Sequence, residues 1–232
     1  WKRADFATLH LTKVHRQDEP DFLQALGEFR KGKISPASAA LLASRVVHFP
    51  NADTPRLFTH NTQVDKWNAY RLSCIDTTET EYQARTNGPG HQIQFLRNNL
   101  LTPEHLVLKP GARVMFTVNK PDLGFVNGQT GTVVVCGRDE VLVDCDGMPI
   151  RVAPYEWRFD ARDKHSATFV QIPLRLAWSL TIHKAQGLTL DSAYIDVRAA
   201  REPGQAYVAL SRVRTLAGLN LKAWFNGVFV SR

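Results

Sequence analysis

The sequence predicts an α/β fold in which a parallel sheet with helices is interrupted by a small all-β module. Toward both ends of the chain, short apolar strands alternate with amphipathic helices, the pattern of a parallel sheet covered by helices. Between these parts, short apolar runs are separated by turns such as Asn127-Gly128 and Asp146-Gly147, which indicate hairpins. We therefore expect residues 1–110 and 172–232 to form the α/β domain, and residues 111–171 to form an inserted β-barrel of the SH3 or OB kind.

The amino-terminal part contains two predicted strand–helix units. Residues 7–14 alternate apolar and polar side chains, as a half-exposed strand does. The helix after them is expected to have Asp18 as its N-cap and to end at Gly32, and a further helix opens at Ser35-Pro36. Residues 56–59 form the second strand, which leads into a helix that starts at residues 60–62. The buried positions of these helices are predicted to be Phe22, Leu23, Leu26, Phe29, Ala39, Leu42, Val46, Val64, Trp67 and Leu72.

The carboxyl-terminal part repeats this order. Residues 172–178 are an apolar run that predicts a strand of the parallel sheet, and the polar segment 181–186 follows it. A short buried strand is predicted at residues 193–197, and an amphipathic helix at residues 205–213. Residues 86–110 have few periodic apolar positions and are interpreted as a connecting region.

Polar side chains follow three of the predicted strands. Arg16 and Gln17 come after the first strand, His60 and Asn61 after the second, and the segment 181–186 after the third. Ligands of parallel sheets bind beyond the carboxyl ends of the strands. We therefore expect these side chains to line one binding crevice.

Composition favours a polyanionic partner. The 232 residues carry a formal net charge of +7 with a pI near 9.5, although a basic surface that binds nothing but water has the same composition. Three cysteines without CxxC spacing argue against a disulfide framework or zinc site and fit a reducing, intracellular compartment. No paired histidine spacing indicates a metal site of the protein itself, and no apolar run reaches the ~20 residues that a membrane span needs.

Several motifs, taken in order, resemble a known family. They are Leu11-Thr-Lys-Val-His-Arg-Gln17, Leu57-Phe-Thr-His-Asn61 with Val64-Asp65, Gly111-Ala-Arg-Val-Met115, Gly124-Phe-Val-Asn-Gly128, Thr181-Ile-His-Lys-Ala-Gln-Gly187 and Tyr207-Val-Ala-Leu-Ser-Arg212. Together they resemble the second motor domain of a superfamily-1, PIF/RecD-like DNA helicase, and they cover nearly the whole chain. The resemblance implies a RecA-like domain interrupted by an SH3-like subdomain, and ATP-driven unwinding of DNA in the 5′-to-3′ direction.

The resemblance also implies nucleotide-facing residues. Phosphoryl transfer is stabilised by cations at the γ-phosphate, and an arginine from a facing domain supplies one. Arg16 and Arg212 match arginine-finger positions, and the competing interpretation of each is a surface ion pair. Gln17, Gly187 and Gln205 are the remaining nucleotide-binding candidates. Gln17 alternatively orients Arg16, and a capping or surface role is open for Gln205.

The predicted nucleic-acid contacts are five polar side chains. Single strands are held by cations and hydrogen-bond donors on their phosphates. Thr181, His183 and Lys184 offer a hydroxyl, an imidazole and an ammonium within four residues, and the competing interpretation of His183 is a buried core histidine. His60 and Asn61 match a second DNA-contacting motif, against the alternative that Asn61 or Thr62 is only an N-cap.

Motifs that cradle phosphate and hold magnesium do not occur in the sequence. No Gly-x-x-x-x-Gly-Lys-Ser/Thr loop is present, nor is a paired acidic motif after an apolar strand. We expect half of a motor, with ATP and Mg²⁺ held mainly by a first RecA-like domain that precedes Trp1. Single-stranded DNA and duplex junctions are the other expected partners, in the cytoplasm or nucleoid of a bacterium or phage, or in a eukaryotic nucleus or mitochondrion. A stand-alone nucleic-acid-binding module, an RNA helicase and a relaxase-linked helicase are the alternatives.

Overall fold

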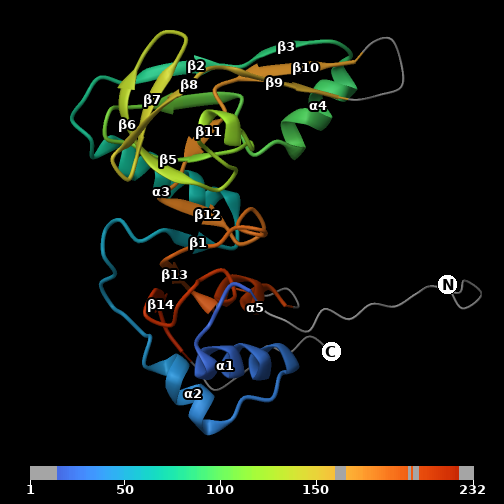
Figure 1. The fold of residues 1–232 in the computed structure, drawn as a ribbon. Helices are drawn as coiled ribbons and strands as arrows, with labels where there is room; N and C mark the ends of the chain where they lie inside the picture. The colour runs from blue at the N-terminus through green and yellow to red at the C-terminus, as the bar shows by residue number, and fades with distance from the viewer. Residues whose placement is uncertain (1–14, 160–165, 198–199, 201–203, 225–232) are drawn as a thin grey trace, which may run out of the picture.

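A four-stranded parallel sheet confirms the predicted α/β class. The structure, a computed structural model, describes residues 15–159, 166–197, 200 and 204–224, so the predicted strand at residues 7–14 lies outside the described residues. The sheet has the order β12-β1-β13-β14, and each neighbouring pair is parallel. Figure 1 shows α1, α2 and α5 at one end of the molecule and the antiparallel sheets at the other, with β1 and β12 between them. The strands of the parallel sheet are β1 (Arg56–Phe58), β12 (Ser179–Thr181), β13 (Ala193–Ile195) and β14 (Leu219–Leu221).

The apolar run at residues 172–178 was assigned to the wrong sheet. Its strand, β11 (Leu174–Leu176), pairs antiparallel with β5 (Arg113–Phe116), and the chain joins the parallel sheet only at Ser179. Burial explains the error, because the apolar side chains from Ile172 to Ile182 pack into two cores in succession. Apolar periodicity marks burial and carries no information about which sheet a strand joins.

Six of the ten predicted helix positions are buried: Phe22, Leu26, Phe29, Leu42, Val64 and Leu72. The other four, Leu23, Ala39, Val46 and Trp67, are only partly buried, and Val46 lies beyond the end of α2. Gly32 ends α1 with a left-handed backbone (φ 70°), and the Ser35 side chain accepts a hydrogen bond from the Ser38 N–H, as an N-cap does. Asp18 was the wrong cap, because α1 begins at Pro20 and Glu19 occupies the N-cap position without a side-chain cap. The helices are α1 (Pro20–Lys31), α2 (Pro36–Ala43), α3 (Asn61–Ser73), α4 (Gly90–Asn99), α5 (Gln205–Leu210) and the 3₁₀ turn η1 (Pro121–Leu123).

A five-stranded antiparallel sheet, ordered β11-β5-β6-β7-β8, occupies the middle of the chain. The predicted Asp-Gly hairpin is confirmed, because Asp146 (φ 53°) and Gly147 (φ 86°) form the left-handed turn between β7 and β8. The pairing of this sheet extends along the chain to Leu176, which lies opposite Val114 and beyond the predicted boundary at residue 171. The SH3-like class of the module and its boundaries at residues 111 and 171 stay predictions. The remaining strands of this sheet are β6 (Thr130–Cys136), β7 (Val141–Cys145) and β8 (Met148–Val152).

The region 86–110, predicted to be a connection, contains regular structure. Its elements find their partners far along the chain, as when β3 pairs with β10, so a local pattern does not reveal them. Only Gln92 and Leu96 are buried in α4, which leaves little apolar periodicity to detect. Within the region lie α4, most of β3 (Arg85–Asn87) and β4 (His105–Leu108). The remaining strands of the molecule, outside this region, are β2 (Thr80–Gln83), β9 (Tyr155–Arg158) and β10 (Thr168–Gln171).

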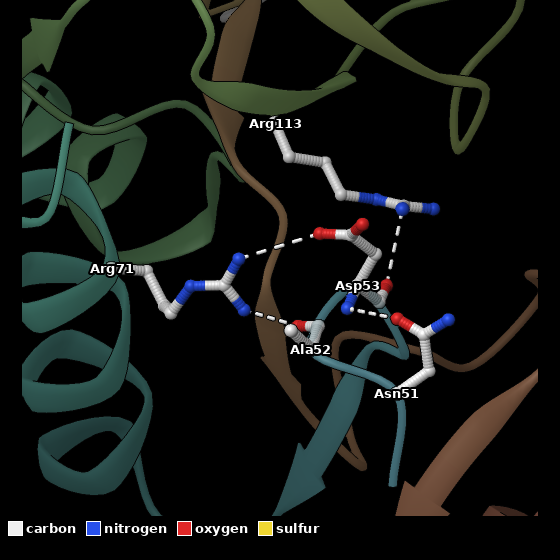
Figure 2. A network of polar contacts seen from close by, with 5 residues as sticks. All are labelled: Asn51, Ala52, Asp53, Arg71 and Arg113. Carbon is white, nitrogen blue, oxygen red and sulfur yellow. Dashed lines mark hydrogen bonds and ion pairs between the residues drawn. The ribbon is translucent and has the colours of Figure 1, made fainter.

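A polar network joins the loop before β1 to both neighbouring parts of the molecule. Figure 2 shows Arg71 of α3 reaching the Ala52 carbonyl and the Asp53 carboxylate, with which it forms an ion pair at 3.3 Å. Arg113 of β5 donates to the Asp53 carbonyl at 3.1 Å, and the Asp53 N–H donates to Asn51 Oδ1 at 2.9 Å. Because the Asp53 side chain is 71% exposed, the ion pair contributes at most about 1 kcal/mol. The network therefore sets the path of the loop more than it stabilises the fold.

Candidate functional site

The carboxyl edge of the parallel sheet brings two of the predicted polar groups together. β1 and β12 are adjacent and parallel, and Phe58 lies opposite Thr181 at their ends. The segments that leave these strands carry His60 and Asn61 on one side and His183 on the other. All three of these side chains are exposed. The edge has the position that ligands take in parallel α/β sheets.

The loop after β12 is a compact turn built on Thr181. The Thr181 side chain is 4% exposed, and its hydroxyl accepts a hydrogen bond from the Lys184 N–H at 3.2 Å. The Ala185 N–H donates to the Thr181 carbonyl at 2.9 Å and closes the turn. Gly187 follows with φ 84°, a conformation that favours glycine, and no neighbouring atom lies within 4 Å of the position of an added Cβ. The turn therefore presents His183 and Lys184 while Thr181 shapes it from within.

His60, rather than Asn61 or Thr62, occupies the N-cap position of α3. Its side chain makes no capping hydrogen bond, and Asn61 is the first residue of the helix. The N-cap alternative for Asn61 and Thr62 is therefore wrong, and both side chains are exposed at the helix start. The core alternative for His183 is wrong as well, because this side chain is exposed. Exposure leaves these side chains accessible to a ligand at the edge.

Apart from the polar side chains at the sheet edge, a separate polar group contains Arg16, Gln17, Ser211 and Arg212. We call it the arginine cluster. Arg16 donates to Thr189 Oγ1 and to the Ser211 carbonyl, both at 3.0 Å. Gln17 is buried and donates to the carbonyls of Ser211 at 3.0 Å and Val213 at 2.9 Å. These bonds hold the segment that carries Arg16 against the turn after α5.

The Arg212 side chain is held by residues at the end of α5 and lies near the positive charge of Arg16. Its guanidinium donates to the Val208 carbonyl at 2.9 Å and to Ser211 Oγ at 3.0 Å. Burial, and secondarily the nearby Arg16, lower the pKa of Arg212 from its ordinary value. Among the residues that the structure describes, no carboxylate forms an ion pair with either arginine. Two cations so placed fit an anionic ligand such as a nucleotide phosphate.

Gln205 is buried at the start of α5, so its surface alternative is wrong. The N-cap position belongs to Gly204, whose backbone is left-handed with φ 74°, and the Gln205 side chain is 7% exposed. Gln205 is the first residue of the helix and is not its N-cap. Its predicted nucleotide contact stays a prediction.

Backbone hydrogen bonds connect the two polar groups. Leu190 forms a parallel bridge with Val213, its N–H donates to the Arg212 carbonyl, and its carbonyl accepts the Arg214 N–H, each bond at 2.9 Å. Leu190 is three residues beyond Gly187, and Arg16 bonds to Thr189 between them. One short backbone segment therefore joins the arginine cluster to the turn that carries His183.

Other kinds of site receive no support from the described part of the chain. No group of three or more histidine, cysteine or acidic side chains is arranged to hold a metal ion there. The three cysteines are free, with Cys74 exposed and Cys145 buried. No helix among the described residues has both the length and the apolar character of a membrane span.

Sequence reasoning missed two buried polar residues near the edge. Asn68 of α3 bonds to the backbone of Ser179, and Arg175 of β11 is buried with its Nε unpartnered. An asparagine within an apolar helix stripe and an arginine within an apolar strand were the available signals. Buried polar groups are normally hydrogen-bonded, so each such residue indicates a specific contact.

Comparison with known proteins gives the family. The chain is 37% identical over 227 residues to the ATP-dependent DNA helicase Pif1 of Bdellovibrio bacteriovorus, an alignment that covers 97% of the chain and 52% of the relative. This chain is a homologue of the Pif1 helicases. It spans between about a third and a half of the length of the curated relatives that it matches. No family model matches the sequence.

Solved Pif1 structures share the fold. Unliganded Pif1 from Bacteroides sp. superposes with a TM-score of 0.82 at 31% identity, covering 95% of this chain and 53% of that one. Pif1 from Bacteroides in complex with ADP-AlF3 and ssDNA superposes with a TM-score of 0.69 at 31% identity, covering 97% and 54%. The Pif1 likeness confirms the predicted resemblance and the α/β class.

Proposed function

We propose that this chain is the carboxyl-terminal half of an ATP-dependent DNA helicase that unwinds DNA in the 5′-to-3′ direction. The observation that carries the proposal is the joining of the arginine cluster to the sheet edge through Leu190, within a chain homologous to Pif1. A motor needs a nucleotide-sensing group and a strand-holding group that move together. Here Leu190 pairs with Val213, next to Arg212, and also follows the turn at residues 181–187, which we call the strand-holding turn.

Arg16 and Arg212 act as the arginine fingers in this proposal. Their guanidinium groups lie close enough for each charge to matter to the other, and the described residues provide no carboxylate to neutralise them. When bound, ATP with Mg²⁺ supplies the phosphoryl group whose developing charge such cations stabilise. Gln17 anchors the Arg16 segment through two buried hydrogen bonds, and Gln205 and Gly187 complete the nucleotide-facing side. The phosphate loop and the magnesium ligands belong to a first RecA-like domain of the same protein.

His60, Asn61, His183 and Lys184 hold the phosphates of a single strand, and Thr181 fixes the turn on which two of them lie. Support comes from their shared sheet edge and from the exposure of His60, Asn61 and His183. The solved complex of a relative with both ADP-AlF3 and ssDNA supports it as well. A net charge of +7 adds long-range attraction for the polyanion. The proposed substrate is a duplex junction, where a single strand held in this way continues into paired DNA.

Replacing both His183 and Lys184 with alanine in the full-length protein is expected to weaken its affinity for single-stranded DNA about tenfold at low salt. Removal of a phosphate contact also flattens the dependence of affinity on salt, by roughly one in the log–log slope. Fluorescence anisotropy of a labelled oligonucleotide at several salt concentrations measures both effects.

The matched control for the double variant is Lys66→Ala with His48→Ala, which removes the same side-chain types at other positions. An unchanged slope and affinity in the His183/Lys184 variant would remove these residues from the strand contact. Competition between DNA and RNA oligonucleotides of the same sequence, measured on the wild type, separates a DNA helicase from an RNA helicase.

A further inference from the structure

A cavity of about 700 Å³ lies next to the turn at residues 181–187 and shares Lys184 with it. It is bounded by α3, the segment around residues 100–107, and β11. Leu72, Leu101 and Leu106 supply apolar wall, and Arg175 and Lys184 supply positive charge. We call this cavity the α3–β11 pocket. It is large enough for a phosphate group together with part of the molecule that carries it.

Arg175 is a buried cation with an unpartnered nitrogen. Its side chain is 8% exposed, its Nε has no hydrogen-bond partner, and one terminal nitrogen donates to the Leu101 carbonyl at 3.4 Å. Burial lowers the pKa of Arg175, and the carboxylate of Asp65, an exposed residue of α3 that also lines the pocket, opposes this effect. A buried guanidinium is normally paired with an anion, because burying the charge alone is costly. Within the described residues, no carboxylate lies at ion-pair distance from it.

Lys184 brings a second positive charge to the same pocket. Its side chain is half-buried, and burial together with Arg175 lowers the pKa of its ammonium, while Asp65 raises it. A bound anion near both groups would offset this unfavourable effect of Arg175 on the Lys184 ammonium.

Most of the other charged side chains of the pocket are already engaged. Arg97 pairs with Glu104 at 2.7 Å, and Lys109 donates to the Ile75 carbonyl at 3.1 Å. The carboxylates of Asp65 and Glu79 also line the cavity, and Asp65 acts on both Arg175 and Lys184. Arg175, Lys184 and Lys109 form no ion pair within the described part of the chain. Of these, Arg175 and Lys184 lie close enough for the charge of Arg175 to act on Lys184.

We propose that the α3–β11 pocket binds a phosphate group through Arg175 and Lys184. A bound strand is the first source of this phosphate, because Lys184 lies on the turn at the sheet edge and its ammonium reaches into the pocket from there. A free phosphate-bearing molecule offers the same chemistry. The strand source rests on the proposed function, whereas the phosphate site itself does not.

The test compares Arg175→Gln with Arg151→Gln in the full-length protein. Arg151 is 76% exposed on β8 and pairs with Glu140, so its replacement removes the same charge away from the pocket. Affinity for an oligothymidylate and for inorganic phosphate is measured with ADP at saturation, which occupies the nucleotide site. We expect Arg175→Gln to lose about tenfold in affinity, the value of a charge-assisted hydrogen bond, and Arg151→Gln to change little.

Ala69→Phe is a second variant that fills the pocket without changing charge. Ala69 is exposed on α3 and lines the cavity, so a larger side chain there is compatible with folding. It is expected to lose phosphate affinity as Arg175→Gln does, and it decides the question if Arg175→Gln does not fold.

The outcomes separate the two sources and the two proposals. Loss of oligothymidylate affinity in both pocket variants supports a strand phosphate, and loss of inorganic phosphate affinity alone supports a free ligand. Unchanged affinity for both probes in folded Ala69→Phe and Arg175→Gln overturns the site while leaving the motor proposal standing. A wild type that binds phosphate in the pocket but no strand contradicts the motor proposal instead.

Discussion

ATP hydrolysis by the full-length protein is expected to fall about 10³-fold when Arg212 is replaced by alanine, the low end of the effect of losing an arginine finger. The guanidinium is positioned by Val208 and Ser211 and is repelled by Arg16, so a phosphate at this point gains a cation that no described carboxylate neutralises. Affinity for single-stranded DNA is expected to change less than threefold, because the strand contacts lie at the other polar group. Steady-state hydrolysis and oligonucleotide anisotropy measure the two effects.

Arg214→Ala is the matched control for Arg212→Ala. Arg214 is two residues away and 60% exposed, and its charge lies 3.6 Å from the Asp191 carboxylate. It should retain most of the wild-type hydrolysis rate. Equal rates for Arg212→Ala and the wild type would remove Arg212 from the nucleotide site. A joint loss of hydrolysis and strand affinity would indicate instead that the turn after α5 had collapsed.

Sequence patterns succeeded where the deciding interaction is local. The helix end at Gly32, the cap at Ser35 and the hairpin at Asp146-Gly147 each follow from the backbone preference or hydrogen bond of residues within one turn. The grouping of His60 with His183 was also predictable, because parallel neighbouring strands end at the same edge.

Patterns failed where the deciding partner is distant in sequence. The strand β11 joins its sheet by pairing with β5, where Arg175 lies opposite Met115. In the same way β3 pairs with the distant strand β10, where Thr86 lies opposite Phe169. Arg175 lies within an apolar run whose pattern assigns it no partner, yet it is buried and donates to the Leu101 carbonyl, 74 residues earlier. Such burial arises only from tertiary packing, which a window of neighbouring residues does not contain.

Asn68 fixes the point at which the chain passes from one sheet to the other. Its Oδ1 accepts the Ser179 N–H at 2.9 Å, and its Nδ2 donates to the Ser179 carbonyl at 3.2 Å. Ser179 is fully buried, and its hydroxyl lies within hydrogen-bond distance of both Asn68 Oδ1 and the Val64 carbonyl. These bonds join α3 to the first residue of β12, two residues before Thr181. The Asn68 side chain therefore anchors the start of β12, the strand that leads into the strand-holding turn.

Asn68→Ala is expected to destabilise this domain by about 3 kcal/mol, because it leaves a buried N–H and a buried carbonyl of Ser179 without their partner. Hydrogen exchange at the Ser179 amide measures the loss locally, and urea unfolding measures it for the domain. Lys66→Ala on the exposed face of α3 is the control and should change stability by less than about 0.5 kcal/mol.

Asn68→Asp distinguishes a backbone-anchoring role for Asn68 from simple space filling. The aspartate keeps an acceptor for the Ser179 N–H but loses the donor to the Ser179 carbonyl, and it adds a buried charge, so it should destabilise the domain as well. Leucine, which fills the space without hydrogen bonds, should be as harmful as alanine. If Asn68→Leu matched the wild type in both amide exchange and unfolding, packing rather than hydrogen bonding would hold β12 in register. Strand affinity should fall together with exchange protection, because the turn carrying His183 is anchored through the same strand.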